Sequence, residues 1–120
     1  MPEEVSSVFG LYLALLSEEK IQDLMDLESR LLTDLRNAKT LSLIYKEGSD
    51  SFPIVEETIG VNFIAEPNEK GIPEIYMTWT GFFENMPSLL KRLTAWDQKS
   101  YGQRKYPLSR LSRIRIIEYK

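Results

Sequence analysis

The spacing of apolar residues changes along this chain from a helical period to a strand period, and this change limits the possible folds most. Between residue 18 and about residue 37, apolar residues recur three, four and seven positions apart, as on one face of an amphipathic helix. These residues are Ile21, Leu24, Met25, Leu31, Leu32 and Leu35. Ser17 is the predicted N-cap of this helix, with Glu18 and Glu19 in its first turn.

The segments after residue 40 alternate between apolar and polar residues instead. Residues 41–45, 55–65 and 74–83 follow this pattern, with turn-forming stretches at 47–51 and 66–71 between them. Three strands joined by short turns predict an antiparallel meander. Gly60 lies inside the second segment and is expected to mark a β-bulge. Residues 111–119 predict a final strand.

Two other segments are expected to be a strand and a helix. Residues 8–16 are apolar on both alternating faces, which favours a central strand covered on both sides, although a buried helix has nearly the same pattern. Pro2, followed by two glutamates, favours the helix, whereas Gly10 and the aromatic residues favour the strand, which is our prediction. A second helix is expected from about residue 85 to Gly102. Its buried stripe would consist of Met86, Leu89, Leu90, Leu93 and Trp96.

The predicted order is therefore β-α-β-β-β-α-β, an α+β fold in which two amphipathic helices pack on a mainly antiparallel sheet. A chain of 120 residues has the usual size of one domain, so we expect residues 1–120 to form a single domain. The sequence shows no internal repeat, no low-complexity segment and no motif by which a known family is recognised.

The chain contains no histidine and no cysteine, which removes most catalytic arrangements. Ser-His-Asp and Cys-His sites are impossible, and the usual zinc ligands are missing. The phosphate-binding sequences GxxxxGK[ST] and GxGxxG do not occur either. We therefore expect no catalytic residues, no cofactor and no metal site. An enzyme that depends on carboxylates alone remains a further hypothesis, because pairs of Asp or Glu are sufficient for glycoside hydrolysis.

Charge is distributed unevenly along the chain. Residues 1–90 carry six Lys or Arg and sixteen Asp or Glu, a balance of −10, whereas residues 91–120 carry nine basic and two acidic residues, a balance of +7. Such an asymmetry points to a charged partner or to pairing within the molecule. The candidate partner-binding residues of the basic segment 91–120 are Arg104, Lys105, Arg110, Arg113 and Arg115, together with Tyr101 and Tyr106.

The basic segment has two competing interpretations. Basic residues interleaved with aromatic ones suit a phosphate backbone with stacked bases, and arginine also binds the carboxylates of a protein partner. Alternatively, these residues form intramolecular ion pairs, which usually contribute less than about 1 kcal/mol each at a surface. The sequence pI of about 5.1 counts against a general nucleic-acid binder.

The first predicted helix is a second candidate surface, because its outer side is acidic. The candidate residues there are Glu19, Asp23, Asp26 and Asp34. Acidic proteins that neutralise a basic partner use such surfaces, since opposite charges accelerate association. A solvated helix exterior explains the same residues more simply.

The composition and charge favour a small non-enzymatic protein that binds another macromolecule through charged surfaces, as an accessory, regulatory, inhibitor or immunity-type subunit. A protein partner is expected first, an RNA- or DNA-contacting role is the alternative, and self-association remains open. Met-Pro-Glu-Glu has the wrong charge for a secretory signal, and the apolar run at 8–16 is too short to cross a bilayer. A cytoplasmic protein without a membrane partner is therefore expected.

Overall fold

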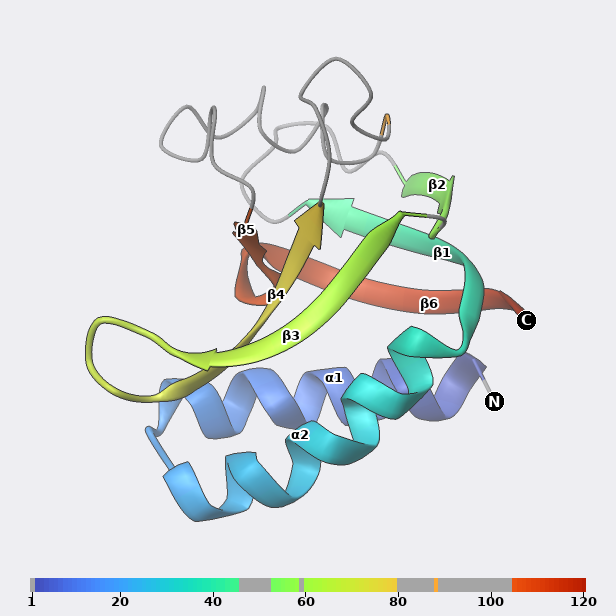
Figure 1. Ribbon diagram of the computed structural model, residues 1–120. Helices are drawn as coiled ribbons and strands as arrows, with labels where there is room; N and C mark the ends of the chain where they lie inside the picture. The colour runs from blue at the N-terminus through green and yellow to red at the C-terminus, as the bar shows by residue number, and fades with distance from the viewer. Residues whose placement is uncertain (1, 46–52, 59, 80–87, 89–104) are drawn as a thin grey trace.

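The computed structural model describes residues 2–45, 53–58, 60–79, 88 and 105–120 (Figure 1). The elements in chain order are α1 (Pro2–Ser17), α2 (Ile21–Arg36), β1 (Ala38–Tyr45), β2 (Pro53–Glu57), β3 (Val61–Pro67), β4 (Pro73–Trp79), β5 (Lys105–Pro107), the 3-10 helix η3 (Leu108–Arg110) and β6 (Leu111–Tyr119). Two helices packed on antiparallel strands confirm the predicted α+β class. The helix predicted between residues 85 and 102 falls outside the described residues.

The strand predicted at residues 8–16 is wrong, because this segment belongs to α1. One side of the helix is buried, through Val5, Val8, Phe9 and Tyr12, and the rings of Phe9 and Tyr12 stack with their centroids 6.0 Å apart. The opposite side carries no charged residue between residues 5 and 17, and Leu11 is 51% exposed there. The residue pattern that suggests a central strand therefore has another cause. The exposed side of this helix is uncharged, so both sides of the segment look apolar in the sequence.

The two helices are joined by a tight turn at Ser17–Lys20. The backbone N–H of Lys20 donates to the carbonyl oxygen of Leu15 at 3.0 Å, and that of Glu19 donates to Leu16 at 3.1 Å. This is the hydrogen-bond pattern of a Schellman C-cap, with Glu19 in the left-handed region at φ +58°. The predicted N-cap at Ser17 is wrong, because Ser17 ends α1. Lys20 precedes α2 without a side-chain capping bond.

Replacing Glu19 with glycine is expected to stabilise the fold by about 0.5–1 kcal/mol, because glycine adopts a positive φ without steric strain. The gain exceeds the loss of the exposed ion pair between Glu19 and Lys70, which is 3.5 Å long. Glu18→Gly is the control, since Glu18 has no positive φ and glycine there only adds flexibility to the unfolded chain. Urea unfolding should show a higher midpoint for the first variant and a lower one for the second. An equal shift of the urea midpoint in both variants would contradict the assignment of Glu19 to the left-handed position of the C-cap.

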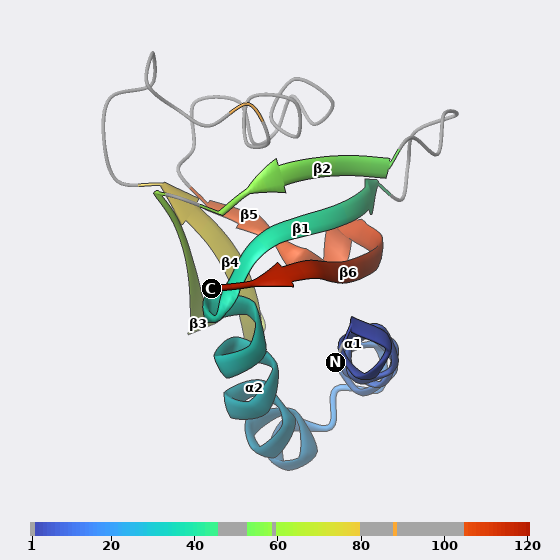
Figure 2. The ribbon, with the colours of Figure 1, turned by 90° about the vertical axis from the view of Figure 1, so that its right-hand side faces the viewer.

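The six described strands form two three-stranded antiparallel sheets, with orders β2-β1-β6 and β3-β4-β5, rather than one sheet. Figure 2 shows the two sheets facing each other across the core, with both helices packed on the same side of them. The segment 55–65, predicted as one strand, is divided between them. Gly60 therefore marks a change of sheet at φ +81° and not a bulge within one strand.

Thr58 fixes this change of sheet. It is the buried polar residue among those described, and its hydroxyl donates to the carbonyl oxygen of Ala38 at 2.5 Å. Its backbone N–H donates to Lys39 at 2.9 Å, and its carbonyl accepts from Val61 at 3.0 Å. The chain thus leaves the first sheet beside β1 and enters the second one at Val61, directly after Gly60.

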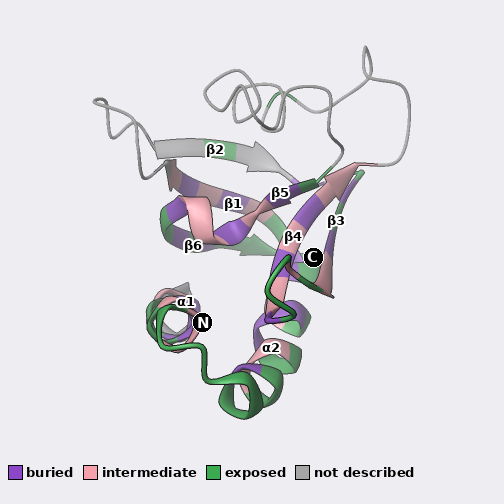
Figure 3. Cartoon of the chain, turned by 90° about the vertical axis from the view of Figure 1, so that its left-hand side faces the viewer, coloured by how far each residue is buried: buried purple, intermediate pink, exposed green. Residues whose placement is uncertain are grey.

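The core lies between the two sheets and the inner sides of α1 and α2 (Figure 3). The predicted helical stripe supplies Leu24, Leu31, Leu32 and Leu35 to it. Ile21 and Met25, predicted to be part of this stripe, are 46% and 52% exposed instead. Both lie in the first turns of α2, where Leu24 is the residue that is buried.

Candidate functional site

Two arginines of the basic segment lie side by side on an exposed strand face. Arg113 and Arg115 alternate along β6 with Ile114 and Ile116, which are completely buried. Because side chains on a strand point to opposite faces in turn, both guanidinium groups lie on the outer face of the β2-β1-β6 sheet. This arrangement follows from the requirement that the two isoleucines reach the core.

The residues paired directly with the two arginines are uncharged. Arg113 lies opposite Ile44 of β1, and Arg115 lies opposite Ser42. Ser42 is also paired with Val55 of β2, which is 51% exposed. We refer to Ser42, Ile44, Val55, Arg113 and Arg115 as the β6 outer face. The predicted single strand 55–65 puts Val55 on the same face as Val61 and Phe63, whereas the structure divides these residues between two sheets.

The other predicted basic residues do not join the β6 outer face. Lys105 belongs to the other sheet, where it forms a short ion pair with Glu66 and its ammonium group lies 5.3 Å from the centre of the Tyr76 ring. Tyr106 is buried in the core, and Arg110 is half-buried in η3. Arg104 and Tyr101 lie outside the described residues. The basic segment is thus not a single patch in the part of the chain that the structure describes.

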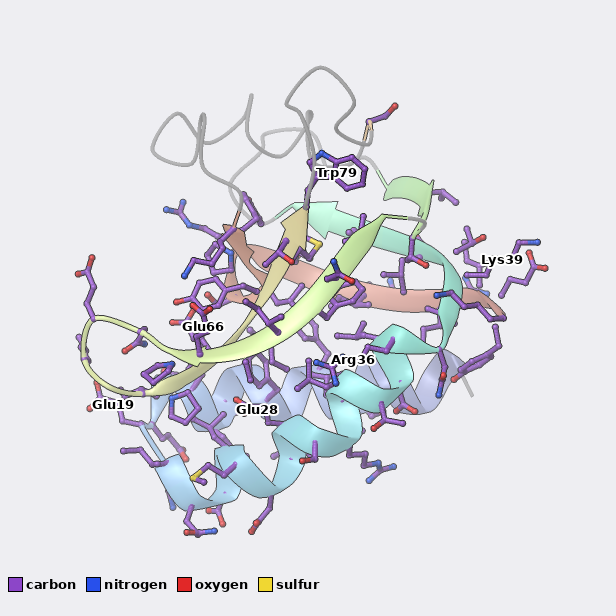
Figure 4. The ribbon with its side chains drawn as sticks, in the orientation of Figure 1. Glu19, Glu28, Arg36, Lys39, Glu66 and Trp79 are labelled. Carbon is purple, nitrogen blue, oxygen red and sulfur yellow. The ribbon has the colours of Figure 1, made fainter. Side chains whose placement is uncertain are left out.

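The predicted acidic residues also divide into two groups. Asp23 and Asp26 are exposed on α2, whereas Asp34, predicted to lie on the same outer side, is half-buried there. Glu19 lies before the helix, in the turn that follows α1, and pairs with Lys70. Figure 4 shows it at the end of the molecule where the β3–β4 loop meets the helices.

Ion pairs between described residues do not connect these acidic residues of α2 with the arginines of β6. The pairs found there are Lys39–Glu118 at 3.4 Å, Lys70–Glu19 at 3.5 Å and Lys105–Glu66 at 2.5 Å. Within the described part of the chain, Arg113 and Arg115 therefore lie on the exposed face without a carboxylate partner, and α2 presents Asp23 and Asp26 elsewhere on the surface.

Glu28 is a partly buried carboxylate that the sequence pattern does not single out, because it resembles the other carboxylates of α2. One of its carboxylate oxygens is buried without a hydrogen-bond partner among the described residues. Burial raises the pKa of this carboxyl above its ordinary value of 4.5. Figure 4 shows Glu28 at the packed side of α2, rather than on its solvent side.

Glu28→Gln is expected to stabilise the protein at neutral pH by about 0.5 kcal/mol, a small effect because water still reaches part of the group. With a raised folded-state pKa, the native protein holds more protons than the unfolded chain at pH values above 4.5, so stability falls as the pH rises through this range. The gain from Gln should therefore disappear below pH 4.5. Denaturant unfolding from pH 3.5 to 7.5 measures it. Exposed Asp26→Asn serves as the control, and an equal gain at every pH would contradict the burial of Glu28.

Groups of three or more acidic side chains that would hold a metal ion are not found in the described ranges of the chain. The described helices include none that is long and apolar enough to cross a membrane. Comparison with known proteins gives no match to a family model, to a curated protein or to a solved structure. The β6 outer face is therefore assessed from its own chemistry.

Proposed function

We propose that this protein is a non-catalytic cytosolic binding protein, an accessory, regulatory or inhibitor subunit, that receives an acidic surface of another protein on its β6 outer face. The observation that carries the proposal is the exposed position of Arg113 and Arg115 on one strand face, without ion pairs to the carboxylates of α2 in the described part of the chain. Charge of this kind is available to a partner, whereas paired charge is not.

The chemistry of the face supports a protein partner. Arginine binds carboxylates through two parallel hydrogen bonds, and it is enriched at protein interfaces. The side chains of Arg113 and Arg115 lie about 7 Å apart along the strand, the spacing of alternate residues in an extended partner segment. Exposed Val55 and half-buried Ile44 add apolar area beside them. These residues together would form an interface centre in which arginine lies beside apolar side chains.

The strand supports the two arginines rigidly. β6 is hydrogen-bonded to β1 along its length, and Ile114 and Ile116 anchor its inner side in the core. A rigid surface loses little conformational entropy when a partner binds. The carboxylates of α2 form a solvated exterior in this proposal and keep acidic partners away from the helices.

Affinity capture with the immobilised chain tests the proposal. The wild-type protein, R113E/R115E and K20E/R30E are each incubated with a native extract, with and without nuclease, and the retained proteins are identified. K20E/R30E is a matched control, because it makes the same change of charge on exposed residues of the helical side. We expect a protein that is retained by the wild type and by this control but bound at least about tenfold more weakly by R113E/R115E.

Two results would contradict the proposal. If both double variants retained the same proteins as the wild type, the β6 outer face would have no part in binding. If the retained material disappeared after nuclease treatment, the partner would be a nucleic acid. In that case, retention on heparin should fall with salt more steeply for the wild type than for R113E/R115E.

A further inference from the structure

A cavity at the free edge of β3 combines positive charge with an aromatic wall. Its volume is about 640 Å³, within the usual size of small-molecule sites. Arg36, Lys105 and Lys120 line it together with Trp79, and none of the described lining residues is acidic. This cavity is formed by α2, β3, β4 and β5, and is separate from the β6 outer face.

Arg36 is held in place by the protein itself. Its Nε and Nη2 atoms donate to the carbonyl oxygen of Phe63 at 3.2 and 2.9 Å, so the guanidinium group covers the free edge of β3 (Figure 4). A guanidinium group has five N–H donors, and the others remain for a ligand. An arginine that is already ordered by the protein loses less entropy when it binds an anion.

The rest of the cavity lining has a charged part and an apolar part. Lys120 is exposed, and its backbone N–H donates to the carbonyl oxygen of Asn37 at 2.9 Å, which fixes the position of this residue beside the end of α2. Lys105 already neutralises Glu66, so Arg36 and Lys120 supply most of the attraction for an anion. Trp79 is half-buried and supplies the aromatic wall, whereas the lining residues Leu35 and Val61 are buried in the core.

We propose that this cavity binds a nucleoside phosphate, with the phosphate near Arg36 and Lys120 and the base against Trp79. Arginine and lysine are the usual partners of phosphate, and stacking of a base on an aromatic side chain contributes about 1–3 kcal/mol. Inorganic phosphate alone would fill only a small part of about 640 Å³ and would leave the apolar wall uncovered.

Isothermal titration calorimetry of the full chain tests this site, with adenosine 5′-monophosphate as the probe and with adenosine and inorganic phosphate as separate arms. The monophosphate should bind at least about tenfold more tightly than either part. Lys120→Gln should weaken its binding about fivefold, and Arg36→Gln about tenfold. Lys39→Gln is the matched control and should have no effect, because Lys39 pairs with Glu118 and does not line the cavity.

Trp79→Leu should weaken binding of the monophosphate about tenfold while leaving phosphate binding unchanged. Because Trp79 also packs against Gly60, Lys120→Gln is the deciding variant if the leucine variant does not fold. The proposal is overturned if the monophosphate does not bind at millimolar concentration, or if Lys120→Gln binds it as tightly as the wild type. It is also overturned if phosphate or adenosine alone binds equally well. Loss of the protein partner in R113E/R115E has no bearing on these results.

Discussion

Gly60→Ala should destabilise the protein by about 2–4 kcal/mol, the largest loss of stability that we expect from any of the proposed substitutions, although it removes no core atom. Gly60 has φ +81°, where a Cβ atom is strained by its own backbone. A Cβ atom at this position would also lie at or within 3.0 Å of three atoms of the Trp79 ring. Since the ring is rigid and half-buried, the corner between the two sheets would have to move.

Two other glycines separate these contributions. Gly71 has φ +78° but open space around its Cβ position, so Gly71→Ala should cost only the backbone strain, about 1–2 kcal/mol. Gly10 lies in α1 with open space and no positive φ, and Gly10→Ala should stabilise the protein by about 0.5–1 kcal/mol. Urea unfolding should give the lowest stability for Gly60→Ala, a higher one for Gly71→Ala and the highest for Gly10→Ala. A Gly60→Ala protein as stable as Gly71→Ala would show that Trp79 does not close on the corner.

Tyr12→Phe is the second large expected effect, a loss of about 1–3 kcal/mol without any change in the shape of the core. The Tyr12 hydroxyl accepts a hydrogen bond from the backbone N–H of Ile75 at 2.9 Å, and both residues are fully buried. Burial raises the pKa of this phenol far above its usual range, with the carboxylates of Glu74 and Glu28 adding to the shift. Phenylalanine would leave the N–H of Ile75 buried without an acceptor.

Hydrogen exchange of the Ile75 amide gives this variant a specific test. In the wild type this amide should be among the well-protected ones, and in Tyr12→Phe it should exchange at least about tenfold faster. Tyr76→Phe is the control, because Tyr76 is half-buried on the outer side of β4 and should change stability by less than about 0.5 kcal/mol. Unchanged protection of Ile75 in Tyr12→Phe would show that the hydroxyl does not hold α1 to β4.

The sequence predicts those elements in which one side is polar and the other apolar. α2, β1, β4 and β6 follow from their patterns, because solvent and core impose a clear period on them. α1 does not, since Leu11 and its neighbours leave the solvent side uncharged and the period ambiguous. Ser17 and the glutamates after it resemble the start of a helix, but the end of α1 occupies these residues.

The alternation of apolar and polar residues also does not predict where the chain passes from one sheet to the other. Four of the five odd positions from 55 to 63 are apolar, the exception being Glu57, although the chain turns between Val55 and Phe63. Val55 consequently faces outward and Phe63 inward, despite their equal parity. The candidate site shows the same limits. The sequence is sufficient to put Arg113 and Arg115 on one strand face, but not to show that Lys105 pairs with Glu66 on the other sheet.

Once the captured partner is purified, its association rate constant at increasing ionic strength is the most direct measure of the β6 outer face. For the wild type and K20E/R30E, the rate should fall steeply between about 50 and about 300 mM NaCl, as expected for attraction between opposite charges. For R113E/R115E it should be at least about tenfold lower at the lowest salt and nearly independent of salt. Equal rates with equal salt dependence for all three proteins would contradict the proposed role of Arg113 and Arg115.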